Sequence, residues 1–147
     1  MLWAALVAPL AAACTTTPAP PPAPDPLAEL AAKARADAAT ATAVASSVPG
    51  LAPVAGEVAK VRTEHAVALQ TEVDRERPPA GSSTPVRPET SAPPAPADPA
   101  AAKTALVAGL TAAEQRIAEL ITSVPRYRAG LLGSVAAGCA SLRDVLT

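Results

Sequence analysis

The side chains that could do chemistry are few and lie far apart in the chain. The sequence holds one histidine, His65, and two cysteines, Cys14 and Cys139. Metal-bound and nucleophilic sites draw heavily on these two residue types. The sequence has no Ser–His–Asp set, Cys-x-x-Cys pair or glycine-rich phosphate loop. Side-chain chemistry would therefore have to use His65, a cysteine or a carboxylate beside one of them.

Cys14 ends a short apolar segment. Residues 2–13 (LWAALVAPLAAA) carry no charge, and their length suits a signal-peptide core better than a mature transmembrane helix. With Cys14 they resemble a bacterial lipobox, in which the cysteine receives a diacylglyceryl group and becomes the mature N-terminus. Two features depart from that pattern: Leu10 stands one place early, and no Lys or Arg precedes the apolar run. A plain Ala-x-Ala cleavage site and a buried N-terminal helix are the alternatives.

A proline-rich segment follows the cysteine, with the sequence TTTPAPPPAPDP. Repeated proline favours an extended, semi-rigid chain. We therefore expect a lipoprotein-type signal peptide over residues 1–13 and a tether over residues 14–25. This reading places the protein outside the cytoplasm, anchored to the cell membrane through Cys14. A cytosolic helical protein whose first residues only look like a signal is the competing location.

The composition favours helices and argues against one class of partner. Half of the residues are apolar, with alanine the commonest, while phenylalanine is absent and aromatic residues make up 1% of the chain. Alanine forms helices readily but buries little area. The net charge is −1 and no basic cluster occurs. Because phosphate binding needs clustered Lys and Arg, and base stacking needs aromatic rings, we expect no nucleic-acid partner.

Two matching sets of helix signals divide the chain. Asp25-Pro26 and Asp98-Pro99 are each typical of a helix start, since Asp caps free N–H groups and Pro suits the first helical position. Each following stretch closes on Ser-Val-Pro, at residues 47–49 and 123–125. The sequence therefore predicts two helical hairpins.

Apolar residues at steps of three and four predict four helices. The expected apolar faces, in chain order, are Leu27, Leu30, Ala34, Ala41, Val44 and Val48; Leu51, Val54, Val58, Val61 and Ala68; Leu106, Leu110, Ala113, Ile117, Leu120 and Val124; and Leu131, Val135, Gly138, Leu142 and Val145. Four such faces are satisfied when they face one another. The fold class is therefore all-α, a four-helix bundle over residues 26–147.

The two hairpins are joined by a linker over residues 78–98. Seven of its 21 residues are proline. At full extension it reaches about 65 Å, whereas a 25-residue helix is about 37 Å long, so it can cross the bundle lengthwise. One long connection between the second and third helices predicts an up-down bundle of the ferritin-like kind.

Two stretches support that topology by resemblance. RTEHAVALQTEV (residues 62–73) and RAGLLGSVAAGCASLRDVL (residues 128–146) resemble segments of uncharacterised ferritin-like lipoproteins from actinobacteria. The resemblance implies a ferritin-like bundle at the cell surface and carries no known activity.

The ferritin-like fold is best known for di-iron sites, which need two Glu-x-x-His pairs. This chain has a single histidine, and Arg62 stands three residues before it, so a site of that kind is excluded. Facing positions in the first hairpin add up to about 100 in residue number, which puts Asp37 and His65 at nearly one level. We expect these two side chains to meet, as a structural or pH-sensitive pair that raises the histidine pKa.

The other charged and small residues singled out by their spacing are expected to have structural roles only. Glu57, Lys60 and Glu64 are expected on a solvated face, as are Glu72, Arg75 and Glu76. Cys139 is expected to be a buried, inert thiol, with an intermolecular disulfide as the alternative. Small residues at four-residue spacing around Gly138 indicate close helix packing.

Taken together, the sequence predicts a non-enzymatic, lipid-anchored surface protein without a cofactor or metal. Its helical bundle would bind an envelope component, a protein or a small ligand. The alternative is a degenerate ferritin-like metal-binding module or enzyme with a single-metal site near Asp37, His65 and Glu114.

Overall fold

The computed structural model describes residues 23–78 and 98–147. Cys14, the signal peptide expected over residues 1–13 and most of the tether expected over 14–25 lie outside the described residues. The same holds for all but the ends of the linker expected over residues 78–98.

Four α-helices make up the described part of the chain, which contains no β-strand: α1 (Pro26–Ser47), α2 (Ala52–Glu76), α3 (Pro99–Leu120) and α4 (Arg126–Leu146). A short 3-10 helix, η1 (Pro49–Leu51), joins α1 to α2. The predicted all-α bundle of four helices is confirmed.

Both predicted helix starts are confirmed by their caps. The Asp25 carboxylate accepts a hydrogen bond from the Leu27 amide at 2.9 Å, and Asp98 accepts one from the Ala101 amide at 2.7 Å. A proline follows each aspartate at the first helical position. These caps fix where α1 and α3 begin.

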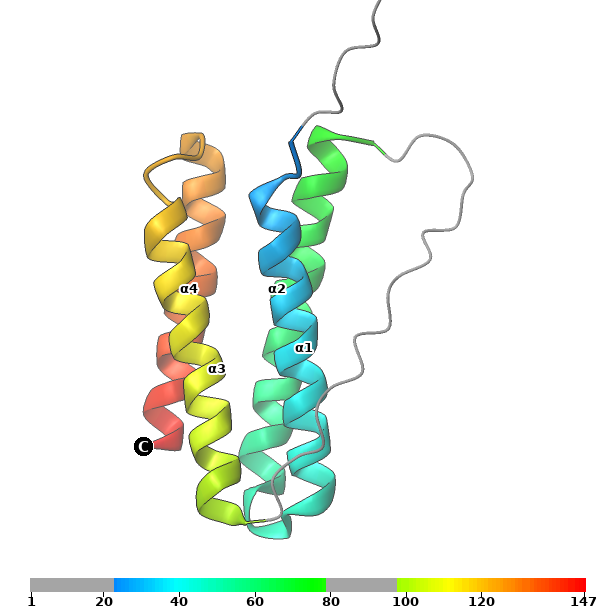
Figure 1. Cartoon of the computed structure of the whole chain (residues 1–147), viewed down its shortest axis with the longest axis vertical. Helices are drawn as coiled ribbons and strands as arrows, with labels where there is room; N and C mark the ends of the chain where they lie inside the picture. The colour runs from blue at the N-terminus through cyan, green and yellow to red at the C-terminus, as the bar shows by residue number, and fades with distance from the viewer. Residues whose placement is uncertain (1–22, 79–97) are drawn as a thin grey trace, which may run out of the picture.

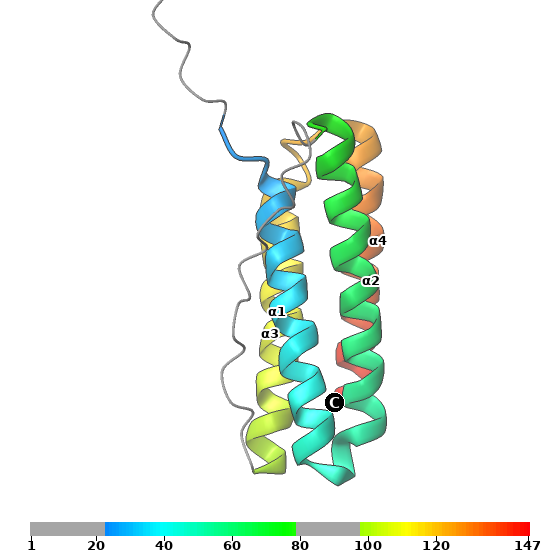
Figure 2. The same cartoon turned by 90° about the vertical axis from the view of Figure 1, so that its right-hand side faces the viewer.

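The helices form a four-cornered bundle in which α1 and α4 occupy opposite corners. Helix α1 packs against α2 and α3, and α4 packs against the same two helices (Figures 1 and 2). In Figure 1, α1 and α4 run downward along the chain, whereas α2 and α3 run upward. Neighbouring helices are therefore antiparallel, and α2 ends at the opposite end of the bundle from the start of α3.

The core faces of α1 and α3 follow the predicted spacing. All six apolar residues expected on α1 and at its end are buried, as are Leu106, Leu110, Ala113 and Ile117 on α3. Five alanines of the first hairpin are also less than 3% exposed. Because alanine is small, these contacts depend on close approach of the backbones rather than on bulky side chains.

The buried faces of α2 and α4 differ from the predicted ones. The buried residues are Ala55, Val58, Arg62, Ala66, Leu69 and Glu72 on α2, and Arg128, Leu132, Val135, Cys139, Leu142 and Leu146 on α4. Val145, expected inside, is 72% exposed. Val58, Val135 and Leu142 are buried as predicted. The prediction missed the three charged residues that take core positions, where ion pairs compensate their charges.

By length and composition, α4 is the one helix of the described residues that could cross a membrane. In the bundle, its buried residues Leu132, Val135 and Leu142 pack into the core that the four helices share. Arg128 and Arg143 on the same helix are held by carboxylates of α2 and α3.

Candidate functional site

A polar group lies among the four helices near the middle of the bundle. It consists of Asp37 on α1, Arg62 and His65 on α2, and Cys139 on α4, and is called the central cluster below. The Arg62 side chain is 2% exposed, and its Nη2 donates to Asp37 Oδ2 at 2.9 Å. Lys33 contacts the same carboxylate from the exposed side of α1. Asp37 is therefore held between two cations.

Arg62, rather than Asp37, is the partner of His65. The guanidinium Nη1 lies 3.2 Å from His65 Nδ1. Because an arginine side chain can only donate, Nδ1 must accept, and the ring is neutral with its proton on Nε2. Among the described residues, no hydrogen bond or ion pair joins Asp37 directly to His65. The hairpin register brings both side chains to one guanidinium, which stands between them.

The electrostatic consequence is opposite to the one expected from the sequence. Burial of the ring and the positive charge of Arg62 lower the pKa of His65 from 6.5 to about 4. The predicted rise in this pKa was wrong, because the ring is partly buried and Arg62, rather than a carboxylate, faces it.

Cys139 completes the central cluster. Its side chain is fully buried, and Arg62 Nη1 donates to Sγ at 3.3 Å. Burial raises the pKa of the thiol above its ordinary value, so it is protonated at neutral pH. The prediction that Cys139 is buried is confirmed. Sequence spacing does not place Cys139 near His65, yet both side chains contact Nη1 of Arg62.

The three ligands of the alternative metal site do not come together. Glu114 on α3 pairs with Arg143 of α4, with Oε2 and Nη1 separated by 3.2 Å. Within residues 23–78 and 98–147, no group of three His, Cys, Asp or Glu side chains could hold a metal ion. A guanidinium already supplies the positive charge that Asp37 requires.

Two glycines allow the central cluster to fit between the helices. A Cβ at Gly138 of α4 would lie 2.8 Å from His65 Nε2, and one at Gly109 of α3 would lie 3.1 Å from Asp37 Oδ1. A Cβ at Gly130 or Gly133 would meet nothing within 4 Å. Among the glycines of α4, close packing is therefore confined to Gly138.

A second buried ion-pair group closes one end of the bundle. Arg128 of α4 donates to both carboxylate oxygens of Asp25, at 3.1 and 2.8 Å, and to Glu72 Oε1 of α2 at 3.1 Å. We call Asp25, Glu72 and Arg128 the end clamp. Glu72 was expected on a solvated face, but only 8% of the residue is exposed. The end clamp joins the starts of α1 and α4 to the last turns of α2.

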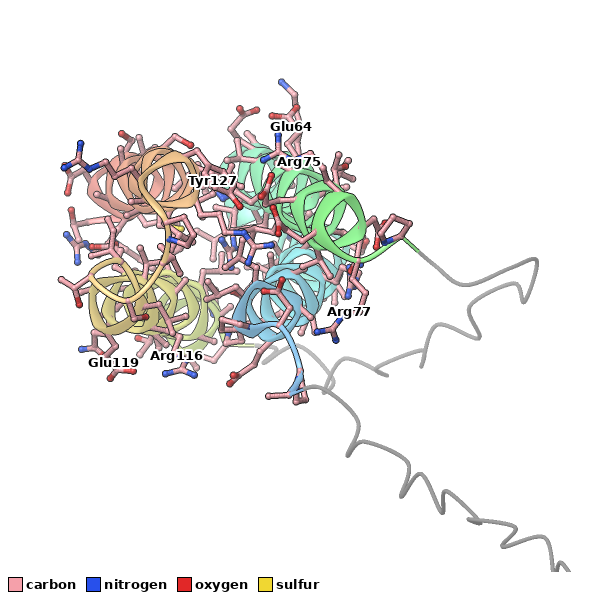
Figure 3. The ribbon with its side chains drawn as sticks, turned by 90° about the horizontal axis from the view of Figure 1, so that it is seen from above. Glu64, Arg75, Arg77, Arg116, Glu119 and Tyr127 are labelled. Carbon is pink, nitrogen blue, oxygen red and sulfur yellow. The ribbon has the colours of Figure 1, made fainter. Side chains whose placement is uncertain are left out.

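The end clamp favours ionised carboxylates. Burial alone would raise the pKa of Asp25 and of Glu72, but hydrogen bonds and positive charge from Arg128 and other arginines outweigh it, so both pKa values are lowered. Around the clamp, Arg75 lies 5.3 Å from the centre of the Tyr127 ring. Figure 3, which looks down on this end, shows the two side chains facing each other between α2 and α4.

An apolar groove lies between α1 and α3 near this end of the bundle. Its volume is about 470 Å³, and half of its lining residues are alanines, at positions 32, 36, 112 and 113, with Leu30 beside them. Glu29 and Arg116 form an ion pair across it at 3.1 Å. Arg116 also pairs with Glu119 on α3, as Figure 3 shows. Small side chains leave room here that larger ones would fill.

Comparisons with known proteins add no relative. No protein-family model matches the chain, and no curated protein or solved structure is significantly similar to it.

Proposed function

We propose that this protein is a non-enzymatic, lipid-anchored protein of the cell surface. Acylated Cys14 would attach it to the membrane, residues 15–25 would act as the tether, and the helical bundle would bind an envelope component, a protein or a small ligand. The observation that carries the proposal is the uncharged segment ending at Cys14, followed directly by a proline-rich stretch.

The described part of the chain supports this layout. Asp25, the last residue of the proposed tether, is fixed by the end clamp, so the tether meets the bundle at its most firmly paired end. The groove between α1 and α3 is lined by the first turns of α1 and the last turns of α3, on the same half of the bundle. A ligand bound there would lie toward the anchor.

The helix directions support a ferritin-like arrangement. Helices α2 and α3 run the same way, so their connection has to start and finish at opposite ends of the bundle (Figure 1). One long connection of this kind is typical of ferritin-like bundles. In place of a metal, this bundle has Arg62 at its centre, paired with Asp37.

A non-enzymatic role is supported by the state of the two reactive residue types. The Cys139 thiol is buried with a raised pKa, which disfavours the nucleophilic thiolate. His65 accepts a hydrogen bond from Arg62 and has a lowered pKa, so it is a weak base. Both groups serve packing in this proposal.

Metabolic labelling with an alkyne fatty acid tests the anchor. The wild-type protein is expected to take up the label and to sediment with membranes, whereas Cys14→Ala should lose both properties. Cys139→Ala is the matched control, because it removes the other cysteine and should remain labelled. Equal labelling of wild type and Cys14→Ala, or wild-type protein that is unlabelled and soluble, would contradict the proposal.

A further inference from the structure

The His65 ring lies at the interface between the two hairpins, near the middle of the bundle. A Cβ placed at Gly138 would come within 2.8 Å of Nε2 and 2.9 Å of Cε1. The ring edge therefore lies directly against the α4 backbone, at a position where α4 has no side chain. Its other nitrogen, Nδ1, faces the guanidinium of Arg62.

The charged and titratable groups around the ring leave no carboxylate to stabilise an imidazolium. On α2 itself, the neighbour is Arg62. On α1, Asp37 is taken up by Arg62 and Lys33. On α4, the neighbour is the protonated thiol of Cys139. On α3, the carboxylate of Glu114 acts on Cys139 and is paired with Arg143.

We propose that His65 is an acid-sensitive contact, which holds the two hairpins together while its ring is neutral and loosens them when Nδ1 takes up a proton. Protonation replaces the hydrogen bond from Arg62 with two cationic donors 3.2 Å apart. The ring is confined by Gly138 on its other side, so the repulsion is relieved by moving the ring and the α4 backbone apart. Burial of the ring and the positive charge of Arg62 also lower the pKa of His65, in keeping with this geometry.

The direction of the pH effect follows from linkage. The unfolded chain binds a proton on histidine near pH 6.5, whereas the native bundle resists it down to about pH 4. The contribution of His65 to the free energy of unfolding is therefore complete above pH 6.5 and is lost as the pH falls toward 4. His65 is the only histidine, and carboxylates ordinarily titrate near pH 4, so the part of this window above about pH 5 belongs to one residue.

The first test is an NMR titration of the His65 ring in the full chain. Because there is one histidine, its carbon-bound ring protons are unambiguous. The account predicts a midpoint near pH 4, or unfolding of the bundle before the ring titrates. A midpoint at or above 6.5 in the folded protein would overturn it.

The second test asks whether the hairpins loosen. In a Cys14→Ser background, Cys139 is the only thiol, and its reaction with 4,4′-dithiodipyridine reports exposure of the bundle interior. The rate is divided by that of the denatured chain at the same pH. Between pH 7 and pH 4.5, this ratio should rise about fiftyfold for wild type and stay nearly constant for His65→Gln, which cannot be protonated.

Equal rises in the two proteins would overturn the proposal. If His65→Gln fails to fold, His65→Asn replaces it in the same assay. The ring titration of the wild-type protein decides the matter without any variant at position 65. None of these outcomes depends on acylation of Cys14, so this inference and the proposed function fail separately.

Discussion

The end clamp and the central cluster are both built on a buried arginine, yet they differ in how its charge is balanced. Arg128 faces two carboxylates, Asp25 and Glu72, and binds one of them through two nitrogens. Arg62 faces one carboxylate, a neutral imidazole and a neutral thiol, and its Nε has no hydrogen-bond partner among the described residues. The charge of Arg128 is balanced by two carboxylates, whereas Arg62 has one carboxylate and an Nε without a hydrogen-bond partner among the described residues.

The difference shows what each group contributes. A guanidinium bound through two nitrogens fixes the geometry of its partner, so the end clamp determines how the second hairpin docks on the first. A buried ion pair with incomplete pairing contributes less, because desolvation offsets the attraction, but removal of one partner is costly. The central cluster is thus the part of the bundle where single changes, including a single proton, have large effects.

The largest expected effect comes from Arg62→Met, which leaves Asp37 half-compensated inside the bundle. We expect a loss of about 2–4 kcal/mol in unfolding free energy, below the full cost of an unpaired buried charge because Lys33 remains. Chemical denaturation measures it. Lys60→Met on the exposed side of the same helix is the control and should change stability by about 0.5 kcal/mol or less.

The double variant Arg62→Met with Asp37→Asn sharpens this result. Once the carboxylate is gone, no unpaired charge remains, and much of the lost stability should return. If the double variant loses as much unfolding free energy as the two single variants added together, Arg62 and Asp37 do not interact energetically.

Arg128→Met should cost about 1–3 kcal/mol, less than Arg62→Met because the end of the bundle is closer to water. Asp25 and Glu72 have lowered pKa values in the wild type, so their contribution is present above about pH 4 and is lost as the pH falls below it. The gap between wild type and variant should therefore shrink at pH 3. Arg126→Met, at an exposed neighbour, should show neither effect.

Gly138→Ala is expected to have the smallest effect of the three substitutions. The new methyl group forces the His65 ring to move, which should cost about 1–2 kcal/mol. Gly133→Ala on the same helix meets no neighbour and should stabilise the protein by up to about 1 kcal/mol through helix propensity. If the two substitutions shift the thermal unfolding temperature equally, the close contact between His65 and α4 is contradicted.

The sequence predicts the helices well because their signals are local. Asp25-Pro26 and Asp98-Pro99 begin α1 and α3, and apolar spacing identifies the core faces of both helices. The same spacing fails on α2, where Arg62 and Glu72 are buried. Hydropathy places an arginine outside, and only its partners on other helices, which sequence spacing does not reveal, make it an interior residue.

The candidate site was predicted only in part, because sequence spacing does not reveal which side chains of other helices lie beside it. Hairpin register brings Asp37 and His65 to the level of one side chain, as expected, but burial of the ring and the charge of the intervening Arg62 lower the pKa of the histidine instead of raising it. One sequence signal indicated that α4 approaches another helix closely. Gly138 lies in mid-helix, where glycine costs about 1 kcal/mol relative to alanine, and such a residue often marks a close approach.

The account of function as a whole depends on Cys14. The most direct measurement is mass spectrometry of the tryptic N-terminal peptide from native protein in the membrane fraction of its host. We predict a peptide running from Cys14 to Lys33 that carries a diacylglyceryl group on the cysteine. An unmodified peptide that still contains the residues before Cys14 would contradict the lipid anchor and leave a helical bundle without an assigned location.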